Sequence, residues 1–211
     1  MSAPSDPTTL AMHGLRLKGF AEAESVAETV GLPEGEAKDL LDRLVADELA
    51  TYRDGRISGF SLTPAGRAEH ADRLSVELDA AGQRADVEAA YRDFLVLNPD
   101  LLSVCTAWQL REVDGESSVN DHTDGIYDAG VVEQLTSLHA KAEPICDRLA
   151  DALDRFSAYG PRLSYALDKV RTGDPDWFTK PMIPSYHTVW FEMHEDLLAT
   201  LSIERGSEVA G

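Results

Sequence analysis

The chain has 211 residues, and its 19 lysines and arginines stand against 38 aspartates and glutamates, a formal net charge of −19 at pH 7. So acidic a surface repels nucleic acids and anionic membranes unless basic residues gather locally. The 43% hydrophobic content is ordinary for a folded protein, and no stretch approaches the ~20 apolar residues that cross a bilayer. The opening MSAPSDPTTL lacks the features of a secretory signal, so we expect a cytoplasmic protein. Cys105 and Cys146 lie in apolar helical contexts and are expected to be free buried thiols.

The first region, residues 1–82, shows helical spacing in three successive segments. The stretch TTLAMHGLRLKGFAEA predicts a helix that begins near Thr8 or Thr9. The stretch ESVAETVGL predicts a shorter helix stopped by Gly31, because glycine readily takes the left-handed conformation that ends helices. The segment PEGEAKDLLDRLVADELA restarts the helical pattern, with Pro33 in the first turn.

A hairpin and a fourth helix are expected next. The segment TYRDGRISGFSL has Asp54-Gly55 at its centre, a dipeptide suited to a tight turn between two short strands. In LTPAGRAEH, Thr63 supplies a helix cap and Pro64 the first helical position. Three helices, a hairpin and a helix predict a winged helix-turn-helix within a mainly α protein.

This order, together with the segments LLDRLVADELATYRDGR and SLTPAGR, resembles the DNA-binding core of MarR-type regulators. The resemblance covers residues 8–80, somewhat over a third of the chain. It implies that the helix at 33–48 enters the major groove of double-stranded DNA, while the hairpin lies near the backbone or the minor groove.

The charges of this region give mixed support to DNA binding. At 100° per residue, the helix at 33–48 turns Asp39 and Asp42 outward, and carboxylates near phosphates are repulsive. Residues 1–75 hold 8 Lys and Arg against 13 Asp and Glu, a balance of −5, and −14 falls on the remainder. Each basic residue has two interpretations. It is either a solvated surface charge or a contact to a DNA phosphate, made twice by a symmetric dimer. The candidate DNA-binding residues are Lys38, Arg43, Arg53, Arg56 and Arg67.

The same region, from LRLKGFAEA to SLTPAGRA, also resembles winged-helix segments attached to phosphoenolpyruvate-utilising enzymes of the pyruvate phosphate dikinase type. The chain holds no ATP-grasp-sized domain and no phosphohistidine domain. This second resemblance therefore implies an accessory or interaction module that does not bind DNA. The outward Asp39 and Asp42 fit it better, and fold alone does not decide between the two functions.

The second region, residues 83–211, is predicted to be an all-α domain. It begins with a helix that Asn98 and Pro99 should interrupt, and the polar GESSVNDHTDG predicts a loop. A long helix follows, which Pro144 should kink or split, then a shorter helix and a last helix over 185–203. We expect this domain to form a homodimer and to bind a small-molecule effector.

Aromatic and imidazole side chains make the second region a candidate effector pocket. It holds all three tryptophans of the chain, and aromatic residues with a few polar groups suit a ligand pocket as well as a helical core. Core packing is the alternative for each residue taken singly. The candidates are Trp108, His139, Trp177, His187, Trp190 and His194.

Metal binding and catalysis are not predicted. On the last helix His187 and His194 lie about 20° apart around the axis but roughly 10 Å apart along it, so they converge poorly on one ion. The same helix turns Glu192, Glu195 and Asp196 to the side opposite its apolar face. No GxSxG, P-loop or GxGxxG sequence is present, so we predict no catalytic residue and no cofactor.

The leading hypothesis is a dimeric MarR-like transcriptional regulator that contacts double-stranded DNA with residues 1–82. Residues 83–211 would mediate dimerisation and bind the effector. The alternative is a non-DNA accessory module that acts with a phosphoenolpyruvate-utilising phosphotransferase or another protein. Neither hypothesis makes the chain an enzyme or a membrane protein.

Overall fold

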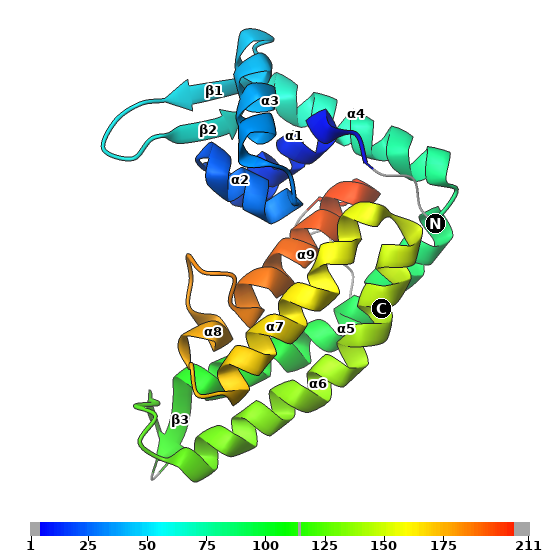
Figure 1. Cartoon of the computed structure of the whole chain (residues 1–211). Helices are drawn as coiled ribbons and strands as arrows, with labels where there is room; N and C mark the ends of the chain where they lie inside the picture. The colour runs from blue at the N-terminus through cyan, green and yellow to red at the C-terminus, as the bar shows by residue number, and fades with distance from the viewer. Residues whose placement is uncertain (1–4, 114, 205–211) are drawn as a thin grey trace.

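The computed structural model describes residues 5–113 and 115–204 and is mainly helical (Figure 1). Its buried apolar side chains form two clusters, one within residues 11–62 and the other within residues 78–198. In Figure 1 the elements up to α4 form the upper part of the molecule and those from α5 onward the lower part. The predicted boundary between residues 82 and 83 lies at the junction of α4 and α5.

Three helices open the chain: α1 (Pro7–Lys18), α2 (Ala23–Val30) and α3 (Glu34–Ala46). Their ends follow from local residues. The side chain of Asp6 accepts a hydrogen bond from the Thr9 N–H at 3.0 Å and caps α1. Gly31, at φ 71°, ends α2 in the left-handed conformation that the sequence predicts. Pro33 directly precedes α3 instead of lying in its first turn.

An antiparallel hairpin follows, formed by β1 (Ala50–Arg53) and β2 (Gly59–Leu62). The hairpin is confirmed, but the tight turn predicted at Asp54-Gly55 is wrong, because residues 54–58 all lie between the strands. The Ser58 hydroxyl donates to the Asp54 carboxylate at 3.1 Å and accepts the Gly55 N–H at 3.3 Å. These contacts stabilise a five-residue loop in place of the two-residue turn.

The segment SLTPAGR joins β2 to α4 (Pro64–Ala81) and packs against the chain that precedes the hairpin. The Thr63 hydroxyl oxygen caps α4 by accepting the Gly66 N–H at 3.0 Å, as predicted, and the Thr63 N–H donates to the Leu49 carbonyl at 3.0 Å. A Cβ on Gly66 would lie only 1.9 Å from that same carbonyl oxygen. Glycine is therefore required by the close approach of two backbones. Arg67 donates to the Leu62 carbonyl at 2.8 Å, so its guanidinium lies against β2.

The second part contains, in chain order, α5 (Arg84–Gln109), β3 (Leu110–Val113), β4 (Glu116–Val119), α6 (Gly125–Ala152), the 3₁₀ helix η1 (Asp154–Ala158), α7 (Tyr159–Arg171), α8 (Asp176–Thr179) and α9 (Tyr186–Leu201). The prediction of an all-α domain is wrong in one respect: β3 and β4 pair as an antiparallel hairpin, in which β4 lies in the segment expected to be a loop and β3 lies just before it. The molecule as a whole remains mainly α.

Two prolines lie inside helices of the second part. The predicted interruption at Asn98-Pro99 is wrong, since α5 continues through Pro99. Pro99 is exposed, while Leu97 and Leu101 beside it are buried in the core, so packing on the inner face offsets the lost backbone hydrogen bond. The helix α6 likewise continues through the exposed Pro144 and is not split there.

The last helix, α9, lies between the two parts (Figure 1). It packs against α5, α7 and α8 on one side and against α1 and α4 on the other. Because both sides are covered, the prediction of a polar side opposite the apolar face needs correction. Glu192, Glu195 and Asp196 on that side are buried.

The two cysteines are free and buried, as predicted, and burial raises the pKa of Cys105 and of Cys146 to about 12. Within residues 5–113 and 115–204, no helix is long and apolar enough to span a membrane.

Candidate functional site

The exposed face of α3 is predominantly acidic. Its two cations, Lys38 and Arg43, both interact along the helix. Lys38 Nζ lies 2.6 Å from Asp42 Oδ2, a hydrogen bond and ion pair that raise the pKa of the Lys38 ammonium. Arg43 Nε donates to the Asp39 carbonyl at 3.1 Å. The exposed carboxylates of α3 are Glu34, Glu36, Asp39 and Asp42.

The other predicted DNA contacts lie on the hairpin and on α4. The Arg53 guanidinium lies over the Phe20 ring, 4.7 Å from its centroid. Arg67 is bonded to the Leu62 carbonyl, as described above. Arg56 is exposed in the hairpin loop and forms no ion pair within the described residues. The structure thus places Arg53 and Arg56 on one projecting hairpin, whereas Lys38 and Arg43 share the acidic face of α3.

Trp108, Trp190 and His194, three of the predicted pocket residues, pack within the helical core. Trp108 stacks on Phe178 with 4.4 Å between ring centroids. The rings of Trp190 and His194 both pack on Phe94, at 4.5 and 5.1 Å. These contacts fill space between helices, which is the role expected of core aromatics.

The remaining three predicted pocket residues are spread around the same part. His139 Nδ1 lies 3.2 Å from the Tyr186 hydroxyl in a buried contact. Trp177 meets the Tyr165 ring edge-on at 5.1 Å. His187 is half-buried, and burial lowers its pKa. None of the six predicted residues lines the cavity beneath α4, the cavity between α1 and α7, or the cavity beside Pro144 and Arg148.

Sequence reasoning missed a buried ionic cluster where α9 meets the rest of the chain. Its centre is the ion pair of Asp196 and Arg155, both with 1% of the side chain exposed. Tyr159 donates to Asp196 at 3.1 Å, and Arg155 Nε donates to Glu77 of α4 at 2.8 Å. Burial alone would raise the pKa of Asp196, but the Arg155 guanidinium and His13 outweigh it and hold that pKa below its ordinary range.

Two histidines extend this cluster into the first part. His13 Nε2 of α1 lies 2.9 Å from Asp196 Oδ2, and His13 Nδ1 lies 3.2 Å from His70 Nε2 of α4. The facing nitrogens of the two rings can therefore share one hydrogen bond, whose donor depends on the tautomer of each ring. Burial, followed by the neighbouring His13, lowers the pKa of His70 to about 3. His70 is therefore neutral at physiological pH.

A second ionic contact lies one turn earlier on α9. Glu192 pairs with Lys18 of α1 at 2.6 Å and with Arg162 of α7 at 2.5 Å. Arg16 of α1 lies 3.3 Å from Glu195. The sequence offered one signal of these contacts: α9 carries three carboxylates and no lysine or arginine, so partners for them must come from other elements. These ion pairs link α9 to α1 and α7.

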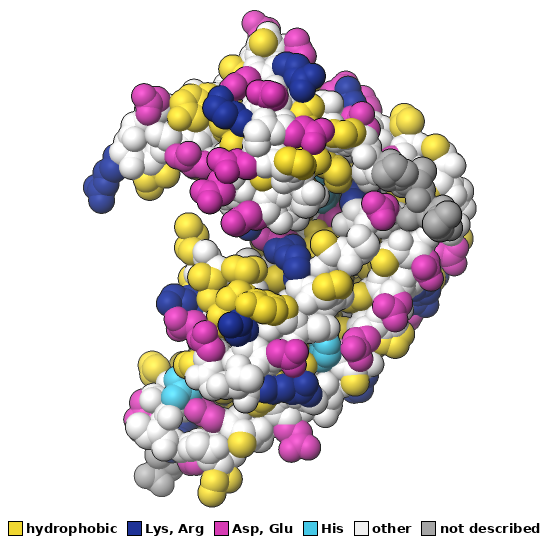
Figure 2. Space-filling model, viewed as in Figure 1, with side chains coloured by type: hydrophobic (Ala, Val, Ile, Leu, Met, Phe, Trp, Pro, Cys, Tyr) yellow, Lys and Arg dark blue, Asp and Glu magenta, His cyan; other side chains and the backbone are white. Residues whose placement is uncertain are grey.

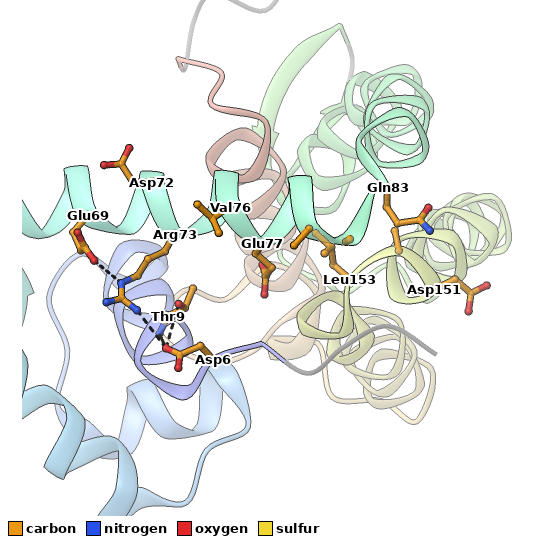
Figure 3. Close-up of a pocket in the computed structure, with 13 residues that line it drawn as sticks. Asp6, Thr9, Glu69, Asp72, Arg73, Val76, Glu77, Gln83, Asp151 and Leu153 are labelled. Atoms are coloured by element: carbon orange, nitrogen blue, oxygen red, sulfur yellow. Dashed lines mark hydrogen bonds and ion pairs between the residues drawn. The ribbon is translucent and has the colours of Figure 1, made fainter.

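A cavity of about 730 Å³ lies beneath α4 (Figure 3). Arg73 bridges Asp6 at 3.5 Å and Glu69 at 2.7 Å on its rim, and Glu77 and Leu153 point toward its centre in Figure 3. A cavity of about 270 Å³ between α1 and α7 is lined in part by His13, Arg155 and Asp196. Within residues 5–113 and 115–204, no three His, Cys, Asp or Glu side chains come together as a metal site.

No family model matches the chain, and the comparisons with curated proteins and with solved structures found no match.

Proposed function

We propose that α1 to α4 and the hairpin form a winged helix-turn-helix, and that the chain is a non-enzymatic accessory protein that binds a partner protein. The exposed face of α3 carries this proposal. In winged-helix DNA readers the helix in this position lies in the major groove. Here it presents four carboxylates, and both of its cations already interact along the helix. Such a face repels phosphates and attracts a basic protein surface.

The resemblance of residues 15–68 to winged-helix segments of phosphoenolpyruvate-utilising enzymes suggests which partner to test first. An accessory module of this kind would act on a phosphoenolpyruvate-utilising phosphotransferase. The buried ionic cluster is consistent with such a role. Through Asp196 it joins α9 and Arg155 of the helical part to His13 of α1, so the proposed winged helix is held in a fixed position for a partner.

DNA-binding regulation is the second candidate, and one observation favours it. Arg53 ends β1 and Arg56 lies at the middle of the loop in a hairpin that projects from the body (Figure 1), where both can reach phosphates. In this proposal the hairpin, and not α3, makes the main contact with double-stranded DNA. The helical part would hold two chains together as a homodimer, so that the weak positive patch of the hairpin is present twice. The same part would bind the effector.

Reversing the charge of α3 distinguishes the two candidates. The variant Asp39→Lys/Asp42→Lys should bind the partner enzyme at least about tenfold more weakly than the native chain does. Neither the native chain nor the variant should bind duplex DNA at low salt. A matched control, Glu88→Lys/Asp100→Lys, changes the same charge at exposed positions on α5. Partner affinity is measured by biolayer interferometry and DNA binding by fluorescence anisotropy.

The DNA candidate makes the opposite prediction for the same variant. If α3 lies near phosphates, Asp39→Lys/Asp42→Lys should bind DNA more tightly, and Arg53→Ala/Arg56→Ala should bind it more weakly. Each lost phosphate contact should also reduce the slope of log affinity against log salt by about 0.9. Duplex binding by the native chain with these shifts would overturn the accessory-protein proposal.

A further inference from the structure

One face of the molecule is hollowed between the two parts. Figure 2 shows this hollow, with the hairpin and α2 on its upper side and α8 and the beginning of α9 on its lower side. Its two sides differ in chemistry. Acidic side chains gather over α2, and hydrophobic side chains gather over the segment that leads from α8 into α9 (Figure 2).

The upper side is acidic because of α2. Its exposed carboxylates are Glu24 and Glu28, and Glu22 is exposed at the residue that precedes the helix. The helix contains no lysine or arginine, and no cation forms an ion pair with these three residues in the described part of the chain. Their negative charge is therefore open to a ligand.

The lower side is apolar because of exposed residues near the start of α9. Met182 is 97% exposed in the loop that links α8 to α9, and Pro181 and Pro184 beside it are exposed as well. Phe191 on α9 is 38% exposed. Single exposed apolar side chains are ordinary, but a gathered set beside a hollow is typical of an interaction surface.

The charge of the surface selects the occupant. A second copy of the chain, with its net charge of −19, would bring a further excess of carboxylates to the acidic side. Nucleic acids and anionic membranes are repelled for the same reason. A polypeptide with one apolar face and one face of lysine and arginine is complementary to both sides of the hollow. An amphipathic helix, about 10 Å across, presents these two faces together.

We propose that the hollow binds a basic amphipathic helix of a partner protein. The apolar face of this helix packs on Met182 and Phe191, and its lysines and arginines face Glu24 and Glu28. The proposal rests on the protein-binding function proposed above and assigns it a second surface, separate from α3.

The test uses the whole chain and a fluorescein-labelled synthetic peptide of about 18 residues, with leucine and lysine at helical spacing. A peptide with glutamate in place of lysine is the control ligand. Binding is followed by fluorescence anisotropy at about 0.15 M salt. Two variants probe the two sides of the hollow: Glu24→Lys/Glu28→Lys removes the acidic side, and Met182→Ser/Phe191→Ser removes the apolar side without a change of charge.

The lysine peptide should bind, the glutamate peptide should not, and each variant should weaken binding at least about tenfold. The control variant Glu88→Lys/Asp100→Lys should change binding by less than about threefold, since it alters only the overall charge. Equal weakening by that control, or no effect of Met182→Ser/Phe191→Ser, would mean nonspecific attraction and overturn the proposal. The α3 variant Asp39→Lys/Asp42→Lys tests the proposed function separately, so the two can fail independently.

Discussion

Replacing Asp196 by asparagine tests whether the buried ion pair with Arg155 holds the two parts of the molecule together. Both side chains are 1% exposed, and Asp196 also accepts hydrogen bonds from Tyr159 and Thr200. The variant puts a neutral amide beside the buried Arg155 guanidinium, which keeps only Glu77 as a carboxylate partner. Breaking a buried pair in this way costs about 3–5 kcal/mol, against a total stability of about 5–15 kcal/mol for a typical protein. Asp196→Asn should therefore lose a large share of the free energy of unfolding.

Urea unfolding measures this loss. Far-UV circular dichroism follows both parts, whereas tryptophan fluorescence follows the second part, which holds all three tryptophans. The control Asp168→Asn disrupts an exposed pair with Arg171, 3.7 Å long, and should change stability by less than about 0.5 kcal/mol. A cost below about 1 kcal/mol for Asp196→Asn would refute the assignment of a tightly coupled buried pair.

A double replacement separates the ion pair from the packing around it. In Arg155→Met/Asp196→Leu neither charge remains, so no uncompensated charge is buried between them. The double variant should be clearly more stable than the sum of the two single losses predicts, by about 2 kcal/mol or more. Additive losses would show that the two charges do not interact.

The remaining predictions concern protonation, backbone packing and thiol reactivity. Because the pKa of His70 is lowered to about 3 in the folded chain, unfolded His70 binds its proton first, and stability should fall as the pH drops from 6.5 toward 3. Urea titrations of His70→Gln should show a flatter pH profile over this range, and an unchanged slope would contradict it. Gly66→Ala should lower the melting temperature by several degrees because its Cβ meets a backbone carbonyl, whereas Gly35→Ala, with open space around it, should raise it slightly. Similar shifts for both would disprove the close contact. Cys105 and Cys146 should react with a disulfide reagent only on unfolding, and rapid labelling of the folded chain would show that they are not buried.

Much of the first part could be predicted because its signals are local. The cap at Thr63, the stop at Gly31 and the order of three helices and a hairpin all depend on residues within a few positions of one another. The interruption expected at Pro99 failed because packing by neighbours distant in sequence decides whether a helix continues. The backbone hydrogen bond that Pro99 removes is offset by the burial of Leu97 and Leu101 on the opposite face of the helix.

The buried carboxylates of α9 could not be predicted in the same way. Viewed alone, the helix has an apolar face and a charged side, and the charged side of a helix usually faces solvent. Asp196 and Glu192 are buried because α1 packs against α9. The α1 residues that contact them, His13 and Lys18, lie more than 170 positions earlier in the chain. Periodicity within one segment contains no information about such partners. The local bonds of Lys38, Arg43 and Arg67 also depend on how these side chains are oriented in the folded chain, so the sequence did not predict them.

The position of α9 also affects how this chain folds as it is made. Synthesis proceeds from the N-terminus, so α1 and α4 leave the ribosome long before α9 exists. Until then His13 and Arg155 have no Asp196 to contact, and the faces of α1 and α4 that α9 covers stay open. The apolar cluster of the first part, within residues 11–62, can therefore form early, whereas the contacts of His13 and Arg155 with Asp196 form only after α9 has been made.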